Sequence, residues 1–423
     1  MRNLSELRAQ LRNTSASKLF GTIYSPDKKE YQRTRYLHAL EQFETCFGDG
    51  AAAFFSAPGR SEICGNHTDH QHGKVLAAAV EPDIIAVVKE NGTSMVQIKS
   101  EGFDDCRVSL QDLAVCEDER GSEAALVKGV LAAMRERGYK IGGFAAYITS
   151  DVPVGAGLSS SAAYETLIGT IVSHLFNEGK IGAEEIAVMG RYAENVYFGK
   201  PCGLMDQMAC CVGDMVYIDF EKETAPKVQK INFALPGYEL CITDTKGSHA
   251  DLTQEYAMVW KEMKAVAACF GREFLREVPE ALFYENLPMV REAAGDRALL
   301  RALHFYEENK RVERAVDAIR RQDAKDFLAT IKASGLSSFR YLQNVYSNAD
   351  AAHQNISVAL AVGENCLGET GACRVHGGGF AGTVLAFVRE DKVMDYTTRM
   401  EQLFGDGACR VLAVRSVGGV PVM

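Results

Sequence analysis

The chain of 423 residues lacks the features that mark several large classes of protein. It contains no run of about 18 apolar residues, so nothing in it is expected to span a membrane. Its first twenty residues hold no long apolar region, which argues against a secretory signal. Its 12 cysteines form no CxxC pair and no zinc-finger spacing. They therefore predict reduced thiols and a cytoplasmic protein.

Positive charge is outnumbered by negative charge, with 46 Lys and Arg against 56 Asp and Glu and a formal net charge of -10. This balance argues against a nucleic-acid surface. An acidic protein can still bind a polyanion such as ATP when backbone N–H groups and a few cations gather at one place. The length allows two or three domains, and we find no internal repeat and no low-complexity tract.

The order of helical and extended patterns predicts an α+β protein. Residues 31–48 predict a helix, and the apolar run that starts at residue 51 predicts a strand that ends at the turn Pro58-Gly59. Asn91-Gly92 lies between two strand-like runs and predicts a hairpin. The polar segment around Ala225-Pro226 predicts a boundary between domains 1–228 and 229–423.

The segment "PVGAGLSSSAAYE", from Pro153 to Glu165, has the composition of an anion-binding loop. Gly155 and Gly157 allow positive φ or a close approach to a ligand. Ser159, Ser160 and Ser161 then open an apolar-faced helix, whose free N–H groups favour a phosphate. The segment is not a Walker A loop, because no GK[ST] follows, and it is not GxGxxG. A plain capped helix after a flexible loop remains the alternative.

The segment "SAPGRSEICGNHTDHQHGKVL", residues 56–76, concentrates polar side chains between turns. His67, His70 and His72 with Asp69 raise the possibility of a zinc site, but closely spaced residues seldom close a tetrahedron alone. A solvated loop is a second interpretation. We favour a polar pocket wall, because buried sugar hydroxyls need donors and acceptors together.

The segment "HGGGFAG", from His376 to Gly382, superficially matches the oxyanion motif of esterases. In those enzymes the motif precedes the nucleophile, whereas here it follows the serines by more than 200 residues. A serine hydrolase is therefore disfavoured.

Three of these stretches together resemble the GHMP kinase superfamily and, within it, the galactokinase family. "APGRSEICGNHTDHQHGKVL" is similar to the sugar signature, "PVGAGLSSSAA" to the phosphate loop and "HGGGFAG" to the C-terminal glycine motif. Further similarities are "PCGLMDQ", "SHADLTQEY" and "ENKRVERAVDA", all in family order. The resemblance implies a two-domain kinase with the ATP and sugar sites in the cleft between the domains.

The resemblance also implies a role for each matching residue. Asp206 aligns with the catalytic aspartate and Arg60 with the arginine that pairs with it. Ser161 and Glu194 match magnesium-binding positions, so Mg²⁺ is the expected cofactor and ATP the co-substrate. The ATP phosphates are expected at Gly155, Gly157, Ser159, Ser160 and Ser161. The expected sugar contacts are Glu62, Asn66, His67, Asp69, Asp206 and Tyr256.

The expected reaction is transfer of the γ-phosphoryl group of ATP to the anomeric hydroxyl of a hexose, with galactose as the first candidate. Related kinases of galacturonate, arabinose or N-acetylgalactosamine remain alternatives, as does a non-catalytic sugar sensor. The expected partners are ATP and a small sugar, with no nucleic acid and no membrane, in a monomer or small homo-oligomer.

The sequence departs from the family pattern GRxNxIGEHTDY at several positions, among them Glu62, Asn66 and His70. Glutamate and asparagine thus appear exchanged four residues apart. We expect this pair to face one site and to keep its hydrogen-bonding groups in swapped places. Ala381 replaces a glycine in the last motif.

Overall fold

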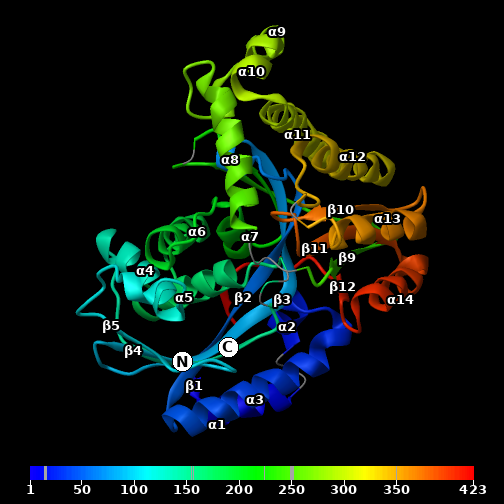
Figure 1. The fold of residues 1–423 in the computed structure, drawn as a ribbon. Coiled ribbons are helices and arrows are strands. Elements are labelled where there is room, and N and C mark those ends of the chain that lie inside the picture. The colour runs from blue at the N-terminus through cyan, green and yellow to red at the C-terminus, as the bar shows by residue number, and fades with distance from the viewer. Residues whose placement is uncertain (14–16, 154, 156, 223, 248–251, 349) are drawn as a thin grey trace.

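The computed structural model describes residues 1–423 except 14–16, 154, 156, 223, 248–251 and 349. Helices and strands alternate, and the described strands form two sheets, one of nine strands and one of four (Figure 1). The larger sheet has the order β1-β2-β3-β6-β4-β5, with β13 on β2 and β7-β8 on β3. Its strands are β1 (Arg2–Asn3), β2 (Ala51–Cys64), β3 (Lys74–Glu90), β4 (Met95–Ser100), β5 (Cys106–Ser109), β6 (Phe144–Ser150), β7 (Met215–Asp219), β8 (Lys227–Ile231) and β13 (Val420–Pro421).

The long strands β2 and β3 are buried on both faces, which explains their nearly continuous apolar sequence. Because side chains alternate along a strand, Phe55 and Ala86 enter one core while Phe54 and Val87 enter another. The sheet therefore separates two hydrophobic layers and gives Arg60, on β2, a rigid support.

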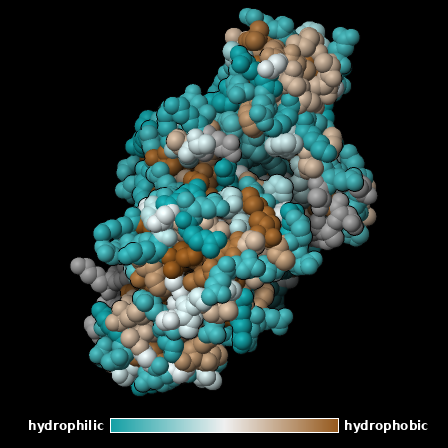
Figure 2. Space-filling model, turned by 90° about the vertical axis from the view of Figure 1, so that its left-hand side faces the viewer, coloured by the Kyte–Doolittle hydropathy of each residue, from teal (hydrophilic) through white to brown (hydrophobic). Residues whose placement is uncertain are grey.

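Each layer of the core is closed by its own helices (Figure 1). The first group, α1 (Leu4–Arg12), α2 (Ser17–Ile23) and α3 (Lys29–Phe47), covers the face that carries Phe54. The second group, α4 (Glu123–Glu136), α5 (Ser160–Phe176), α6 (Ala183–Tyr192) and α7 (Met205–Val212), covers the opposite face. Figure 2 shows the molecule from the side of α4 and α6, where hydrophilic atoms dominate around a central hydrophobic area.

The smaller sheet has the order β10-β11-β9-β12 and is entirely antiparallel. Its strands are β9 (Tyr238–Asp244), β10 (Ala372–His376), β11 (Thr383–Arg389) and β12 (Cys409–Leu412). Helices α13 (Asn355–Leu367) and α14 (Val393–Phe404) pack on it. The upper part of Figure 1 is helical and holds α8 (Thr253–Ala268), α9 (Glu280–Glu285), α10 (Leu287–Ala294), α11 (Asp296–Arg320) and α12 (Ala324–Ser337).

The end of the chain returns to the larger sheet. Val420 and Pro421 pair with Ser56 and Phe55 of β2. Nearby, Arg415 donates to Asp83, 3.0 Å away, and Arg35 donates to the other oxygen of the same carboxylate at 2.6 Å. All three side chains are buried, so this ion triad joins α3, β3 and the C-terminal segment.

Two expected features differ in the structure. Asn91-Gly92 does not join a hairpin, because β6 lies between β3 and β4 and runs parallel to β4. The Asn91 side chain instead stabilises the segment between β3 and β4: its Oδ1 accepts from the Thr93 N–H, and its Nδ2 donates to the Met95 carbonyl. The strand from residue 51 also continues through Pro58, where a register shift between Pro58 and Gly59 lets a residue without an N–H remain inside the sheet.

Other expectations are confirmed. The helix expected over 31–48 is α3, and the mixture of helices and strands agrees with the expected α+β class. The division into domains 1–228 and 229–423 stays a prediction, and β8 spans residue 228 while pairing with β7. Within the described residues, none of the helices combines the length and apolarity that crossing a membrane requires.

Candidate active site

The glycine-serine loop leads directly into α5. Gly155 and Gly157 both have positive φ, and an added Cβ at Gly157 would lie 2.5 Å from Thr383 Oγ1. Ser159 precedes the helix in the left-handed conformation, and Ser160 is its first residue. The first N–H groups of a helix have no intrahelical acceptor. The structure thus places the described part of the predicted loop at a helix N-terminus; Val154 and Ala156 lie outside the described residues.

Arg60 and Asp206 meet beside this loop. Arg60 Nε donates to Asp206 Oδ1 and Arg60 Nη2 to Oδ2, both at 2.6 Å, which is a bidentate ion pair. Ser159 Oγ also donates to Asp206 Oδ2, and Arg60 Nη1 donates to the Gly157 carbonyl. Burial opposes the charge of Asp206, but Arg60 and Ser159 outweigh it and hold the pKa of Asp206 below its usual value. Asp206 is therefore a carboxylate at neutral pH.

Glu194 lies in the π-helical segment η5 (Ala193–Phe198) that follows α6. The Ser161 hydroxyl donates to Glu194 Oε1 at 2.9 Å, and Lys200 Nζ lies 2.9 Å from the same oxygen. Gln207 Nε2 donates to Glu194 Oε2 at 2.7 Å and to Glu165 at 3.0 Å. The two expected metal ligands are thus adjacent, and a hydroxyl with a carboxylate is the hard-oxygen donor set that suits Mg²⁺.

The sugar signature forms a turn at the end of β2. Asp69 opens a short 3₁₀ helix, Asp69–Gln71, and its carboxylate lies against Gly203, three residues before Asp206 in the chain. Burial, reinforced by the charge of Asp206, raises the pKa of Asp69 to about 7. His67 Nε2 lies 2.9 Å from the Gly378 carbonyl, and burial lowers the pKa of this ring to about 4. Its hydrogen bond to a carbonyl therefore comes from a neutral ring.

Two of the three signature histidines contact each other, and the third packs on an aromatic ring. His67 Nδ1 lies 3.3 Å from His70 Nε2, whereas His72 stacks on Phe274 with ring centres 3.8 Å apart. Across the described part of the chain, no group of three or more His, Cys, Asp or Glu side chains has a metal-binding arrangement.

Glu62 and Asn66, which were expected to face one site, contact each other. Asn66 Nδ2 donates to Glu62 Oε1 at 3.0 Å and to the Gly377 carbonyl at 2.6 Å. Arg374 Nη2 donates to Glu62 Oε1 at 2.8 Å. Burial raises the pKa of Glu62, and Arg374 opposes that rise. Both side chains are buried within protein, Glu62 3% and Asn66 0% exposed.

The C-terminal glycine motif forms a turn that side chains of other elements hold. Tyr256 OH donates to the Gly379 carbonyl at 2.8 Å. His376 Nε2 lies 3.1 Å from the Glu62 N–H, and its Nδ1 lies 2.8 Å from Thr383 Oγ1. This turn therefore lies against both β2 and the phosphate loop. Ser248 to Asp251, part of the "SHADLTQEY" similarity, lie outside the described residues.

Sequence reasoning assigned no role to three residues that hold this arrangement. Arg374 lies two residues before the quoted glycine motif and His376 is its first residue, so their charge or ring could have drawn attention to them. Asn344, which donates to Asn66 Oδ1 at 2.7 Å, carries no local signal, because its partner is 278 residues away in the chain.

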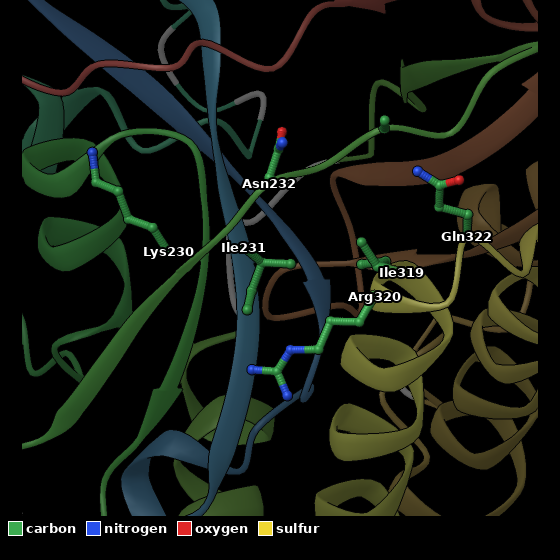
Figure 3. A pocket seen from close by; sticks show the side chains of 7 residues that line it. Lys230, Ile231, Asn232, Ile319, Arg320 and Gln322 are labelled. Carbon is green, nitrogen blue, oxygen red and sulfur yellow. The ribbon is translucent and has the colours of Figure 1, made fainter.

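A separate pocket of about 300 Å³ lies between β8 and the end of α11 (Figure 3). It is lined by Lys230, Ile231, Asn232, Ala234, Ile319, Arg320 and Gln322. The Arg60–Asp206 pair belongs to β2 and α7 instead.

Comparison with known proteins points to one group. Residues 125–214 match the family model of the GHMP kinases N terminal domain, and residues 41–90 match the galactokinase galactose-binding signature. The chain is 31% identical to a galactokinase of Streptomyces coelicolor over 388 residues, which cover 90% of this chain and 95% of that protein. It is 30% identical to a galactokinase of Actinobacillus pleuropneumoniae, over 84% of this chain and 90% of that protein.

Solved structures show the same fold. The crystal structure of Lactococcus lactis galactokinase complexed with galactose matches with a TM-score of 0.79 at 24% identity, covering 91% of this chain and 99% of that one. Mevalonate kinase of Methanococcus jannaschii matches with a TM-score of 0.62 at 16% identity, over 86% of this chain and 99% of that one.

Proposed function

The chain belongs to the galactokinase family, and from this premise we propose that it transfers the γ-phosphoryl group of ATP to the anomeric hydroxyl of galactose. The observation that carries the proposal is the Arg60–Asp206 ion pair at the N-terminus of α5. An acid and a guanidinium stand there beside a helix terminus that favours phosphate. Phosphoryl transfer needs such positioning and charge neutralisation above all.

Asp206 is the proposed acceptor of the proton from the attacking hydroxyl. Its low pKa keeps it ionised, so it is in the form that can accept a proton or orient the hydroxyl. Arg60 holds both carboxylate oxygens and so fixes the direction of the carboxylate. The positive charge of Arg60 also offsets charge that builds up on the phosphoryl group.

The phosphates of ATP are proposed to lie at Gly155, Gly157 and the three serines Ser159, Ser160 and Ser161. Gly155 is exposed, and an added Cβ there would meet open space, which leaves room for a ligand on that side of the loop. Ser161 and Glu194 are the residues that would hold Mg²⁺, which would neutralise phosphate charge when bound. Glu194 is 1% exposed, and Lys200 supplies its present counter-charge.

The sugar is proposed to lie against Asp69 and Asp206. His67 and Tyr256, which bond to the C-terminal glycine turn, are the other proposed contacts. The charge of Asp206 contributes to the raised pKa of Asp69, so the two carboxylates lie within electrostatic range of each other. Two acceptors close together suit a ligand that presents neighbouring hydroxyl donors. The ATP and sugar sites would thus meet between the two parts of the chain, with the boundary near residue 228.

The test is release of ADP by the purified protein with ATP, Mg²⁺ and each of galactose, arabinose, galacturonate and N-acetylgalactosamine. We expect turnover that is fastest with galactose, and a sugar 1-phosphate identified by phosphorus NMR. If ADP release depends on a different sugar of the panel and not on galactose, the proposed reaction stands and the proposed substrate changes. Binding of galactose without turnover would replace the kinase by a sugar sensor.

A further inference from the structure

The carboxamide of Asn66 has its hydrogen-bonding capacity taken up by the protein itself. A primary amide offers two N–H donors and two acceptor positions. Nδ2 donates to Glu62 and to the Gly377 carbonyl, while Oδ1 accepts from Asn344 at 2.7 Å and from Ser338 at 3.3 Å. The side chain is 0% exposed. A sugar hydroxyl could bind it only by displacing one of these partners.

Glu62 is held just as completely, and its charge is matched. Arg374 is 0% exposed and donates from Nη2 to Glu62 and from Nη1 to the Ile63 carbonyl at 2.9 Å. These contacts join β2 to β10, which lie against each other in the fold (Figure 1). Separating the two partners of such an ion pair is costly, because each would be left as an unpaired buried charge. The pair therefore resists relative movement of β2 and β10.

The contacts of Glu62 and Asn66 are linked through the backbone to the Arg60–Asp206 pair. Glu62 is two residues from Arg60 on β2, and its N–H meets His376 of the glycine motif. Gly377, bound by Asn66, is the residue after His376. A shift of Glu62 or Asn66 would therefore move the strand that carries Arg60 and the turn that packs on the phosphate loop.

We propose that Glu62, Asn66 and Arg374 form a positioning unit that fixes the sugar-signature turn to the C-terminal glycine turn. In this unit Asn66 acts through Arg60 and Gly377 and makes no contact with the sugar. The exchange of acid and amide has moved the carboxylate to residue 62, next to Arg374, and has left residue 66 as a neutral crosslink. The inference rests on the proposed kinase function for its kinetic readout.

The test uses the isosteric variants Glu62→Gln, Asn66→Asp and the double variant. In Asn66→Asp, a carboxylate oxygen replaces Nδ2 and faces both Glu62, 3.0 Å away, and the Gly377 carbonyl. We expect its kcat to fall about tenfold or more while the KM values for galactose and ATP change less than about threefold. Thermal unfolding should shift down by several degrees. The double variant restores one acid facing one amide, so it should lose less than the product of the two single losses.

Asn91→Asp is the matched control, because it makes the same chemical change beside one carbonyl, that of Met95, and away from the active site. We expect its kcat to stay within about twofold of the wild type. Rates are measured well below each unfolding temperature, so a merely structural role would lower stability and leave kcat unchanged. Asn66→Ser is measured alongside, in case Asn66→Asp does not fold.

Three results would overturn the inference: a galactose KM raised about tenfold with kcat unchanged in Asn66→Ser, single losses that multiply without coupling, or an unaltered kcat in folded Asn66→Asp. If the wild type phosphorylates no sugar, the proposed function fails on its own. The unfolding temperatures of the double-mutant cycle then still decide whether Glu62 and Asn66 are coupled.

Discussion

Replacement of Asp206 by asparagine is the sharpest perturbation of the proposed mechanism. The change preserves shape, removes the charge and leaves one oxygen where two now accept 2.6 Å hydrogen bonds from Arg60. Loss of a positioned proton acceptor lowers a rate by about 10²–10⁴-fold. At about 1.36 kcal/mol for each factor of ten, this equals roughly 2.7–5.5 kcal/mol of activation free energy. We expect kcat to fall within that range.

Binding of ATP should survive the same substitution. The loop glycines and the N-terminus of α5 keep their places, so the phosphate site is unaltered except for the Ser159 hydroxyl, which loses a charged acceptor. The free energy of unfolding should fall by about 1.5–3 kcal/mol, since at least one charge-assisted hydrogen bond to the buried Arg60 is lost. Turnover is measured as ADP release at saturating substrates, and ATP affinity by titration calorimetry.

Asp219→Asn provides the control, because it also removes an acid paired with an arginine, Arg276 at 3.1 Å, on a strand of the same sheet. It should cost stability and leave kcat within about twofold of the wild type. Near-normal turnover in Asp206→Asn, or equal losses of kcat in both variants, would refute the assignment of Asp206 as proton acceptor.

Three further outcomes are expected. Burial raises the pKa of Asp69 to about 7 from 3.8, so its contribution to stability is full below pH 3.8 and is lost as pH rises to about 7. The unfolding temperature of Asp69→Asn should therefore rise relative to that of the wild type as pH increases from 4 to 7. A difference between the two unfolding temperatures that does not change with pH would contradict this. Glu194→Gln should raise the Mg²⁺ concentration for half-maximal activity at least about tenfold, and an unchanged midpoint in a Mg²⁺ titration would remove Glu194 as a ligand. Asp83→Asn should lower the free energy of unfolding in urea by about 3–5 kcal/mol, because Arg415 would be left buried without a carboxylate and Arg35 would keep only Asp151; a loss below about 1 kcal/mol would show that the triad contributes little.

The sequence allowed prediction of features that depend on local chemistry. The glycines and serines before α5 identified a helix terminus, because these residues carry the relevant backbone freedom and donors. The Arg60–Asp206 pair, 146 residues apart, was implied only by the resemblance to a known family. Glu62 and Asn66 were expected to face one site; they bond to each other inside the protein, and their place at a sugar site stays a prediction.

Features that depend on distant pairing could not be predicted in this way. A hairpin at Asn91-Gly92 was wrong because β6, more than fifty residues later, inserts between the two strands. The strand expected to stop at Pro58 continues, because a register shift against β3 accommodates the missing N–H. Arg374 and Asn344 reach Glu62 and Asn66 only through tertiary packing.

The pairing of β13 with β2 bears on how the protein is made and handled. Phe55 and Ser56, five and four residues before Arg60, acquire their β13 partners only when Val420 and Pro421 have been translated. The Phe54 N–H likewise waits for the carbonyl of Met423. During synthesis this side of the nascent sheet therefore stays open to other extended segments. Residues added directly after Met423 would lie beside the strand that carries Arg60, so a long spacer before any such addition is the safer choice for kinetic work.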